Sequence, residues 1–168
     1  MLVATSRLSG SVYEQSVLVA APLARGGHIG FIINRPTNVK LEALFPDQAA
    51  CREVVDPVYM GGMELSNAVF ALARGAADPM GTIEFMPGLV AVIDGTAIDR
   101  VIQTAPTSAR FFVGAAVWAQ GELEDQIREG AWEVRPANRE LVFRTDPSDL
   151  WNQLHGPTRE PTLTRSWI

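Results

Sequence analysis

Short apolar runs recur along almost the whole chain, and they constrain its fold more than any other feature. Each run has the length and the β-branched or aromatic content of a strand, and several are apolar on both faces, which is typical of buried strands. The runs are Leu2–Ala4, Ser16–Ala21, His28–Asn34, Val58–Met60, Ala68–Ala73, Leu89–Ile93, Arg110–Val117 and Leu141–Arg144. With 168 residues, of which 47% are hydrophobic, the chain is long enough to build one domain around this sheet.

The connections between these runs favour antiparallel pairing. Gly26 and Gly27 follow the second run and can adopt positive φ, so the second and third runs are expected to form a hairpin. Helices are expected at irregular places: from Thr96, which we expect to be the N-cap, after Gly121, and from an N-cap at Asp146. Because strands and helices do not alternate strictly, we predict an α+β domain with a mixed, largely antiparallel sheet.

Two segments differ from this strand pattern. Val39–Phe45 is expected to form two helical turns that end before Pro46. Residues 155–168 contain two prolines and have no periodicity, so we expect the domain to span residues 1–154 and this segment to be an irregular tail. Trp167 and Ile168, at its end, are expected either to dock on the domain or to bind a partner.

Composition excludes several classes of function. The net charge is −5 and the basic residues are scattered singly, which makes direct nucleic-acid binding an improbable role. The single cysteine, Cys51, excludes an intramolecular disulfide. We find neither a secretory signal pattern nor an apolar run approaching the roughly 20 residues of a membrane span, so we expect a cytoplasmic protein without membrane contact.

The usual catalytic sets are incomplete. Gly26-Gly27-His28-Ile29-Gly30 resembles a phosphate-binding loop, but an apolar strand follows it where a helix N-terminus is needed. His28 and His155 are the only histidines and lie far apart in the sequence, which gives little support to a hydrolase triad or a metal site. Cys51 fits a small buried residue or an incidental surface thiol better than a reactive cysteine. We therefore expect no cofactor and no metal, and assign no catalytic residue.

Two strand exits are harder to explain by packing alone. Asn34-Arg35-Pro36 places polar groups at the end of an apolar strand, and Pro36 forces Arg35 into an extended conformation and should end the strand pairing. An ordinary strand exit and a binding role explain this equally well. Val58-Tyr59-Met60-Gly61-Gly62 is a second exit, whose glycines either make a turn or allow the close approach of a ligand.

Four blocks of sequence together resemble the AlgH/YqgE family of bacterial proteins. The blocks are Phe31–Pro36, Val58–Gly62, Phe112–Trp118 and Gly121–Trp132. The resemblance implies a single α+β domain whose sheet curls into a pseudo-barrel with short helices outside. It also implies a genetic link to transcriptional regulation without an assigned reaction. The chain departs from the family pattern at Gly114-Ala115-Ala116-Val117-Trp118, which lacks a usual tyrosine and glycine, and at Met63, where proline is common.

We therefore expect a non-enzymatic regulatory or protein-interaction domain whose partner is another protein. The predicted binding surface lies at neighbouring strand ends and comprises Asn34, Arg35, Gly61, Gly62, Trp118 and Glu124. Arg35 and Trp118 are expected to face one hollow, as a forked donor and a rigid apolar wall. The alternative is an enzyme of unassigned class, in which the carboxylates after Gly121 act as acid or base and Asn34 and Arg35 hold a small anionic substrate.

Overall fold

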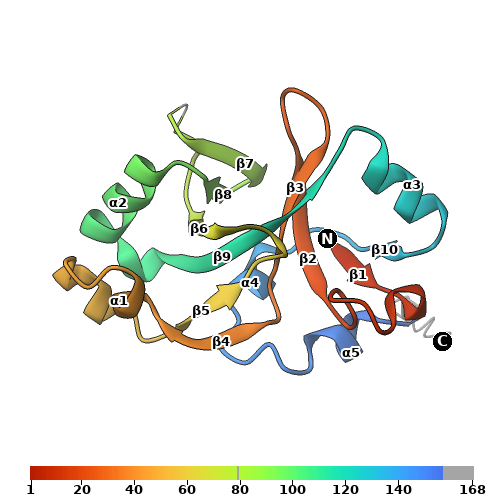
Figure 1. The fold of residues 1–168 in the computed structure, drawn as a ribbon, viewed down its shortest axis with the longest axis horizontal. Coiled ribbons are helices and arrows are strands. Elements are labelled where there is room, and N and C mark those ends of the chain that lie inside the picture. Colours follow the sequence, from red (N-terminus) through yellow and green to blue (C-terminus); the bar gives the residue numbers. More distant parts are fainter. Residues whose placement is uncertain (79, 157–168) are drawn as a thin grey trace, which may run out of the picture.

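The computed structural model describes residues 1–78 and 80–156, which form a curled sheet with short helices around it (Figure 1). The strands are β1 (Leu2–Ala4), β2 (Val17–Pro22), β3 (His28–Ile32), β4 (Pro36–Lys40), β5 (Pro57–Met60), β6 (Glu64–Arg74), β7 (Thr82–Met86), β8 (Leu89–Val92), β9 (Ala109–Trp118) and β10 (Trp132–Val134). The helices are α1 (Leu41–Leu44), α2 (Gly95–Thr104), α3 (Glu122–Arg128), α4 (Arg139–Val142) and α5 (Leu150–Leu154), with 3₁₀ turns at Ser6–Leu8, Ala49–Glu53 and Pro106–Ser108.

The sheet runs in the order β10-β1-β2-β3-β9-β6-β8-β7, and the pairs along this path are antiparallel. β5 adds a parallel pair with β9 and an antiparallel pair with β4. β9 holds the two halves of the molecule together, because its first part pairs with β6 and its last residues pair with β3 (Figure 1). The predicted α+β domain with a mixed, largely antiparallel, curled sheet is confirmed.

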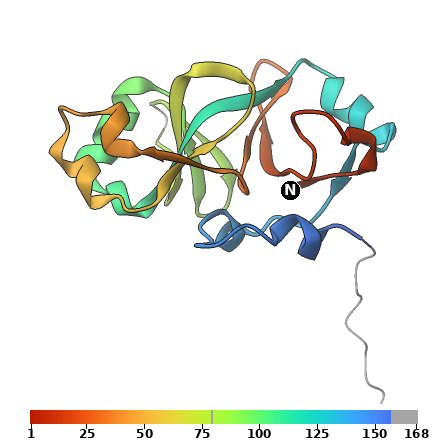
Figure 2. The same cartoon turned by 60° about the horizontal axis from the view of Figure 1, so that its bottom comes forward.

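The main core lies on the inner face of this curled sheet. The Phe31 ring packs against those of Phe70, Phe85 and Phe112, with centroids 5.4 to 5.7 Å away. α4 and α5 run along one side of the sheet (Figure 2), and the buried Val142 and Leu150 join the same core. Each buried side chain of this size stabilises the fold by about 1.5–3 kcal/mol relative to exposure.

The predicted strand at Leu141–Arg144 is wrong. Its first residues belong to α4, which Asn138 caps by accepting a hydrogen bond from the Glu140 N–H. The buried Arg110 of β9 donates to the carbonyls of Val142 and Arg144 at 2.9 and 2.8 Å. These carbonyls are satisfied by a guanidinium instead of a neighbouring strand, which an apolar run alone does not reveal.

Other expected boundaries are shifted. The N-cap of α2 is Asp94, not Thr96, and the N-cap of α5 is Asp149, not Asp146. Asp146 instead accepts from the backbone of Ser148 in a local turn. Val39 belongs to β4, so that only one turn of the expected helix forms, as α1.

We expected Pro36 to end the strand pairing. Instead, Pro36 begins β4 and pairs with Tyr59 of β5. The Gly26-Gly27 hairpin and the helix after Gly121 form as predicted, and both hairpin glycines have positive φ. Within residues 1–78 and 80–156, every helix is too short or too polar to cross a membrane.

Candidate functional site

A hollow of about 500 Å³ lies where α3, β10, the end of β9 and the start of β6 meet the segment before β2. We call it the Trp hollow, and the residues that define its chemistry are Arg7, Tyr13, Glu64, Trp118, Glu122, Gln126, Glu129 and Trp132. These residues come from three separate stretches of the sequence, residues 7–13, residue 64 and residues 118–132. The curl of the sheet brings them together, since β9 carries Trp118 across to the half that contains β10 and α3 (Figure 1).

Two tryptophans and one glutamine form the inner wall. The indole N–H groups of Trp118 and Trp132 both donate to Oε1 of Gln126, at 3.0 and 2.9 Å. The two rings lie edge to face, with centroids 6.3 Å apart and an interplanar angle of 83°. Both residues are about 95% buried, with 5% and 4% of their surface exposed. The Gln126 oxygen therefore fixes both rings without a direct bond between them.

Tyr13 continues this aromatic wall toward solvent. Its ring packs edge-on against Trp132, with centroids 5.9 Å apart and an interplanar angle of 70°. Its hydroxyl donates to Oε2 of Glu64 at 3.2 Å and accepts from the Met63 N–H at 3.4 Å. Burial, with a smaller contribution from Glu64, raises the pKa of Tyr13 to about 12, so the phenol is neutral at physiological pH.

Asn34 and Arg35, two of the predicted binding residues, hold the segment that carries Tyr13. Asn34 accepts from the Val17 N–H and donates to the Gln15 carbonyl, both at 2.9 Å. The Arg35 guanidinium donates to the carbonyls of Val12 and Glu14. We expected Arg35 and Trp118 to face one hollow, but only Trp118 lines the Trp hollow. Arg35 instead holds the loop that carries Tyr13.

Gly61 and Gly62 allow the start of β6 to approach β9. A Cβ at Gly62 would lie 2.1 Å from the Ala115 carbonyl carbon, and one at Gly61 would lie 2.3 Å from the Gly114 oxygen. This contact places Glu64, two residues further on, where it accepts from the Val117 N–H at 3.4 Å. The paired glycines serve a close approach of backbone to backbone.

Glu124, the sixth predicted residue, lies outside the lining of the Trp hollow. Its carboxylate is half exposed and lies 3.9 Å from Nε2 of His28, on the neighbouring hairpin. One predicted residue thus lines the hollow and four support its walls. The binding role of all six stays a prediction.

Carboxylates surround the opening of the hollow. Glu64, Glu122 and Glu129 are exposed, and Arg7 is the only basic residue in the lining. Glu122 also accepts from the Ala119 N–H at 2.8 Å, which anchors its carboxylate at the start of α3. With three formal negative charges against one positive charge, the lining carries a net charge of −2. The hollow combines aromatic walls with an acidic opening.

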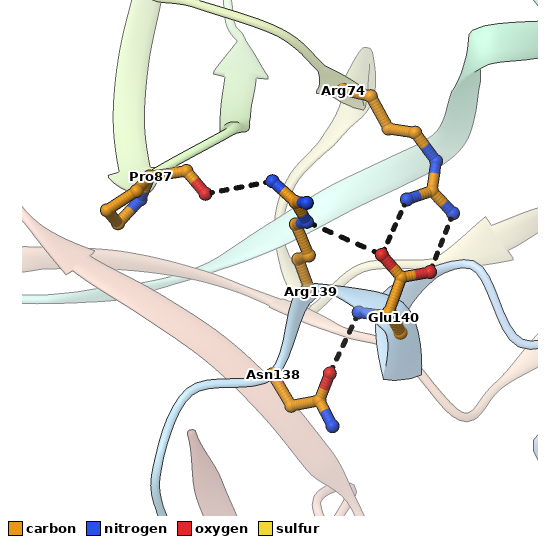
Figure 3. A network of polar contacts seen from close by, with 5 residues as sticks. All are labelled: Arg74, Pro87, Asn138, Arg139 and Glu140. Atoms are coloured by element: carbon orange, nitrogen blue, oxygen red, sulfur yellow. Dashed lines mark hydrogen bonds and ion pairs between the residues drawn. The ribbon is translucent and has the colours of Figure 1, made fainter.

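A larger groove of about 1170 Å³ lies between the β7–β8 turn and residues 135–156. Figure 3 shows the polar network at its edge. Glu140 accepts from Arg74 at 2.9 and 3.2 Å and from Arg139 at 3.4 Å, while Arg139 also donates to the Pro87 carbonyl. The hydrogen bonds from Arg74 hold the pKa of Glu140 below its usual range. These contacts tie α4 to the sheet and to the turn.

Three further expectations from the sequence concern Cys51, metal binding and the C-terminal residues. Cys51 is fully buried in the core cluster next to α2, and burial raises the pKa of its thiol. Among the described residues, no three His, Cys, Asp or Glu side chains gather in a way that could hold a metal ion. Trp167 and Ile168 lie outside the residues that the structure describes.

Reasoning from the sequence did not identify five lining residues as parts of one site: Tyr13, Glu64, Gln126, Glu129 and Trp132. Trp132 belongs to a block that carried the family resemblance, and Gln126 lies between helix residues already noted for their charge. A buried pair of tryptophans needs hydrogen-bond acceptors for its indole N–H groups. That requirement, applied to the residues of the predicted helix after Gly121, was the available signal for Gln126.

Comparison with known proteins places the chain in a family. Residues 1–159 match the AlgH-like family, and the chain belongs to it. UPF0301 proteins of Chlorobium phaeobacteroides and Streptomyces coelicolor are both 30% identical, over 91% and 92% of this chain and 82% of each relative. The solution structure of the AlgH protein from Pseudomonas aeruginosa has a TM-score of 0.72 at 24% identity, over 90% of this chain and 84% of that one. A crystal structure of a protein from Corynebacterium diphtheriae gives 0.75 at 23%, over 96% and 86%.

Proposed function

We propose that this member of the AlgH-like family is a non-enzymatic regulatory domain of the cytoplasm that binds a protein partner at the rim of the Trp hollow. Its proposed link to transcriptional regulation rests on the family's genetic association. The observation that carries the proposal is a set of exposed apolar side chains beside the aromatic wall. Val12, Met63 and Leu65 are exposed by 49%, 48% and 54%, on the two segments that the Tyr13–Glu64 hydrogen bond joins.

This arrangement fits the anatomy of a protein interface. Interface centres are rich in tryptophan and tyrosine, and a ring of less important contacts around them excludes water. Val12, Met63 and Leu65 would supply that surrounding contact area, and Tyr13 would supply a rigid ring at the edge of the hollow. Isolated exposed apolar residues need no explanation, but three on adjoining segments beside a cavity are typical of a binding surface.

Leu65 adds a second observation. It has a φ of 52°, a left-handed conformation that is unfavourable for a branched side chain, and its neighbour Glu64 lines the hollow. Gln15, with a φ of 56°, lies two residues after Tyr13. Conformations of this kind persist only where surrounding contacts enforce them, and they cluster at binding sites. Both segments that carry the exposed apolar side chains contain one.

Site-specific photo-cross-linking in cells tests the proposal. A benzophenone amino acid is placed at Met63 or at Leu65, and Met80, which is 74% exposed and does not line the hollow, serves as the matched control. We expect one protein adduct of the same mass from positions 63 and 65 and none from position 80. Equal adducts at all three positions, or none at 63 and 65, would overturn the proposed surface.

A further inference from the structure

We infer that the Trp hollow takes one basic side chain, arginine or lysine, from the partner polypeptide. This inference rests on the proposed function and specifies the chemistry of the partner at that site. Three properties of the hollow carry it: the arrangement of its aromatic rings, the charge of its opening and its size.

The aromatic rings meet as a corner. Tyr13 and Trp118 each lie edge to face against Trp132, with interplanar angles of 70° and 83°. The two indoles expose only 5% and 4% of their surface, so the partly exposed Tyr13 presents most of the aromatic surface to the hollow. An aromatic ring presents negative electrostatic potential at its face, so the Tyr13 ring favours a cationic group over a neutral one of equal size.

The opening has the complementary charge. Glu64, Glu122 and Glu129 line the hollow together with the rings, and Arg7 is the only positive group in the lining. The Tyr13 phenol stays neutral because burial raises its pKa to about 12, so it adds a dipole and a ring without a charge. A carboxylate ligand would face three like charges here, which disfavours the small anionic substrate of the alternative hypothesis at this site.

The volume sets the size of the ligand. About 500 Å³ accommodates one long side chain and the adjoining backbone of a peptide, and it is near the lower end for small-molecule sites. The methylene stem of arginine or lysine can lie along the partly exposed Tyr13 ring while its charged end meets the carboxylates. The exposed Met63 and Leu65 would then contact residues that flank the basic side chain in the partner.

Nuclear magnetic resonance titration tests this inference without knowledge of the partner. The probe is N-acetyl-arginine amide, and its neutral isostere N-acetyl-citrulline amide is the ligand control. We expect saturable shifts of the indole N–H resonances of Trp118 and Trp132, with a dissociation constant on the order of 10 mM, and weaker binding at high salt. The Trp151 indole N–H, which donates to the Ala4 carbonyl and does not line the hollow, should shift much less.

Two charge variants should change the affinity for the arginine probe in opposite directions. Glu129→Gln should weaken binding about threefold, and Arg7→Gln, which removes the competing cation, should tighten it by about the same factor. Glu84→Gln changes the net charge equally on β7, outside the hollow, and should leave the affinity unchanged. These exposed substitutions keep the fold, so the comparison does not depend on removing a buried tryptophan.

The two proposals can fail separately. Equal shifts from the citrulline and arginine probes, or no shift at either tryptophan, would overturn the basic-side-chain inference. If positions 63 and 65 still cross-link to one protein in that case, the interaction surface stands and only the chemistry of its partner is wrong. If the arginine probe binds but positions 63 and 65 give no adduct, the cation site stands without a protein partner at this rim.

Discussion

Trp118 and Trp132 donate their indole N–H groups to the same oxygen atom of Gln126. Replacing Gln126 with methionine keeps a side chain of similar length but removes that acceptor. Because two largely buried donors would then lack a partner, we expect the free energy of unfolding to fall by about 2–4 kcal/mol. Urea unfolding followed by tryptophan fluorescence measures this loss.

Gln126→Glu is the matched control for this substitution. It retains an oxygen that can accept from both indoles, so it should lose much less stability than the methionine variant. If both variants unfold at the same urea concentration, the shared acceptor has little energetic importance, and packing alone fixes the two rings.

Gly62→Ala should destabilise the domain although it removes no polar group. The added methyl carbon would lie 2.1 to 2.3 Å from backbone atoms of Ala115 and Ala116, so one of the two strands must move. We expect a loss of at least about 2 kcal/mol in the free energy of unfolding. Thermal unfolding of Gly62→Ala beside Gly95→Ala makes the comparison direct.

Gly95 is a suitable control because a Cβ there would meet nothing within 4 Å. It is the first residue of α2, and alanine is a better helix former than glycine, so Gly95→Ala should be neutral or stabilising by up to about 1 kcal/mol. Similar losses in the two variants would show that backbone flexibility, not the close approach to β9, decides the choice of glycine.

Arg35 acts on the Trp hollow through the loop that it fastens. Arg35→Ala removes the donors to the carbonyls of Val12 and Glu14, which hold the segment around Tyr13. We expect a loss of about 1–2 kcal/mol in stability. Loss of the Arg35 charge by itself would raise the pKa of Tyr13 further, whereas a looser segment leaves the phenol better solvated. We expect loosening to dominate, so that the pKa of Tyr13 moves from about 12 toward its ordinary value.

The pKa of Tyr13 distinguishes a positioning role of Arg35 from a general loss of stability of the domain. Arg74→Ala removes a paired arginine of similar size at the distant groove and should leave the Tyr13 titration unchanged. Arg35→Lys should restore the titration in part, since an ammonium group can reach one of the two carbonyls. A Tyr13 pKa in Arg35→Ala that stays at about 12 or rises would show that Arg35 does not hold the segment around Tyr13 in place.

The local features of the fold were predictable because they depend on nearby residues. The Gly26-Gly27 hairpin needs only positive φ at a tight turn, and α3 needs only its flanking glycines and its charge pattern. The strand expected at Leu141–Arg144 failed because a distant residue decides it. Arg110, 32 residues before Val142, satisfies the carbonyls that a neighbouring strand would otherwise bind.

The candidate site was predictable only in part for the same reason. Apolar character and position at a strand end suggested Trp118 as a binding residue, and Trp118 lines the Trp hollow, but its binding role stays a prediction. Charge at a strand end suggested that Arg35 faces a ligand, yet the loop before β2 folds back and takes its donors. Where that loop lies follows from the pairing of β1 with both β2 and β10, which no local pattern specifies.

The two tyrosines should make the domain lose stability in alkaline solution. Burial raises the pKa of Tyr13 to about 12 and also raises that of Tyr59 above the ordinary value of 10.0. A raised pKa means that the folded state favours the neutral phenol. This contribution is complete below about pH 10, where the unfolded tyrosine would ionise, and is lost as pH rises toward 12.

Tyr13→Phe isolates the share of Tyr13 in this decline. Between pH 10 and 12 we expect the free energy of unfolding of the wild type to fall by about 1–2 kcal/mol more than that of Tyr13→Phe. Urea unfolding at stepped pH measures the difference, and phenolate absorbance reports ionisation directly. Half-ionisation of both tyrosines near pH 10 in the folded protein would contradict the burial of Tyr13 against Trp132, and with it the aromatic corner of the Trp hollow.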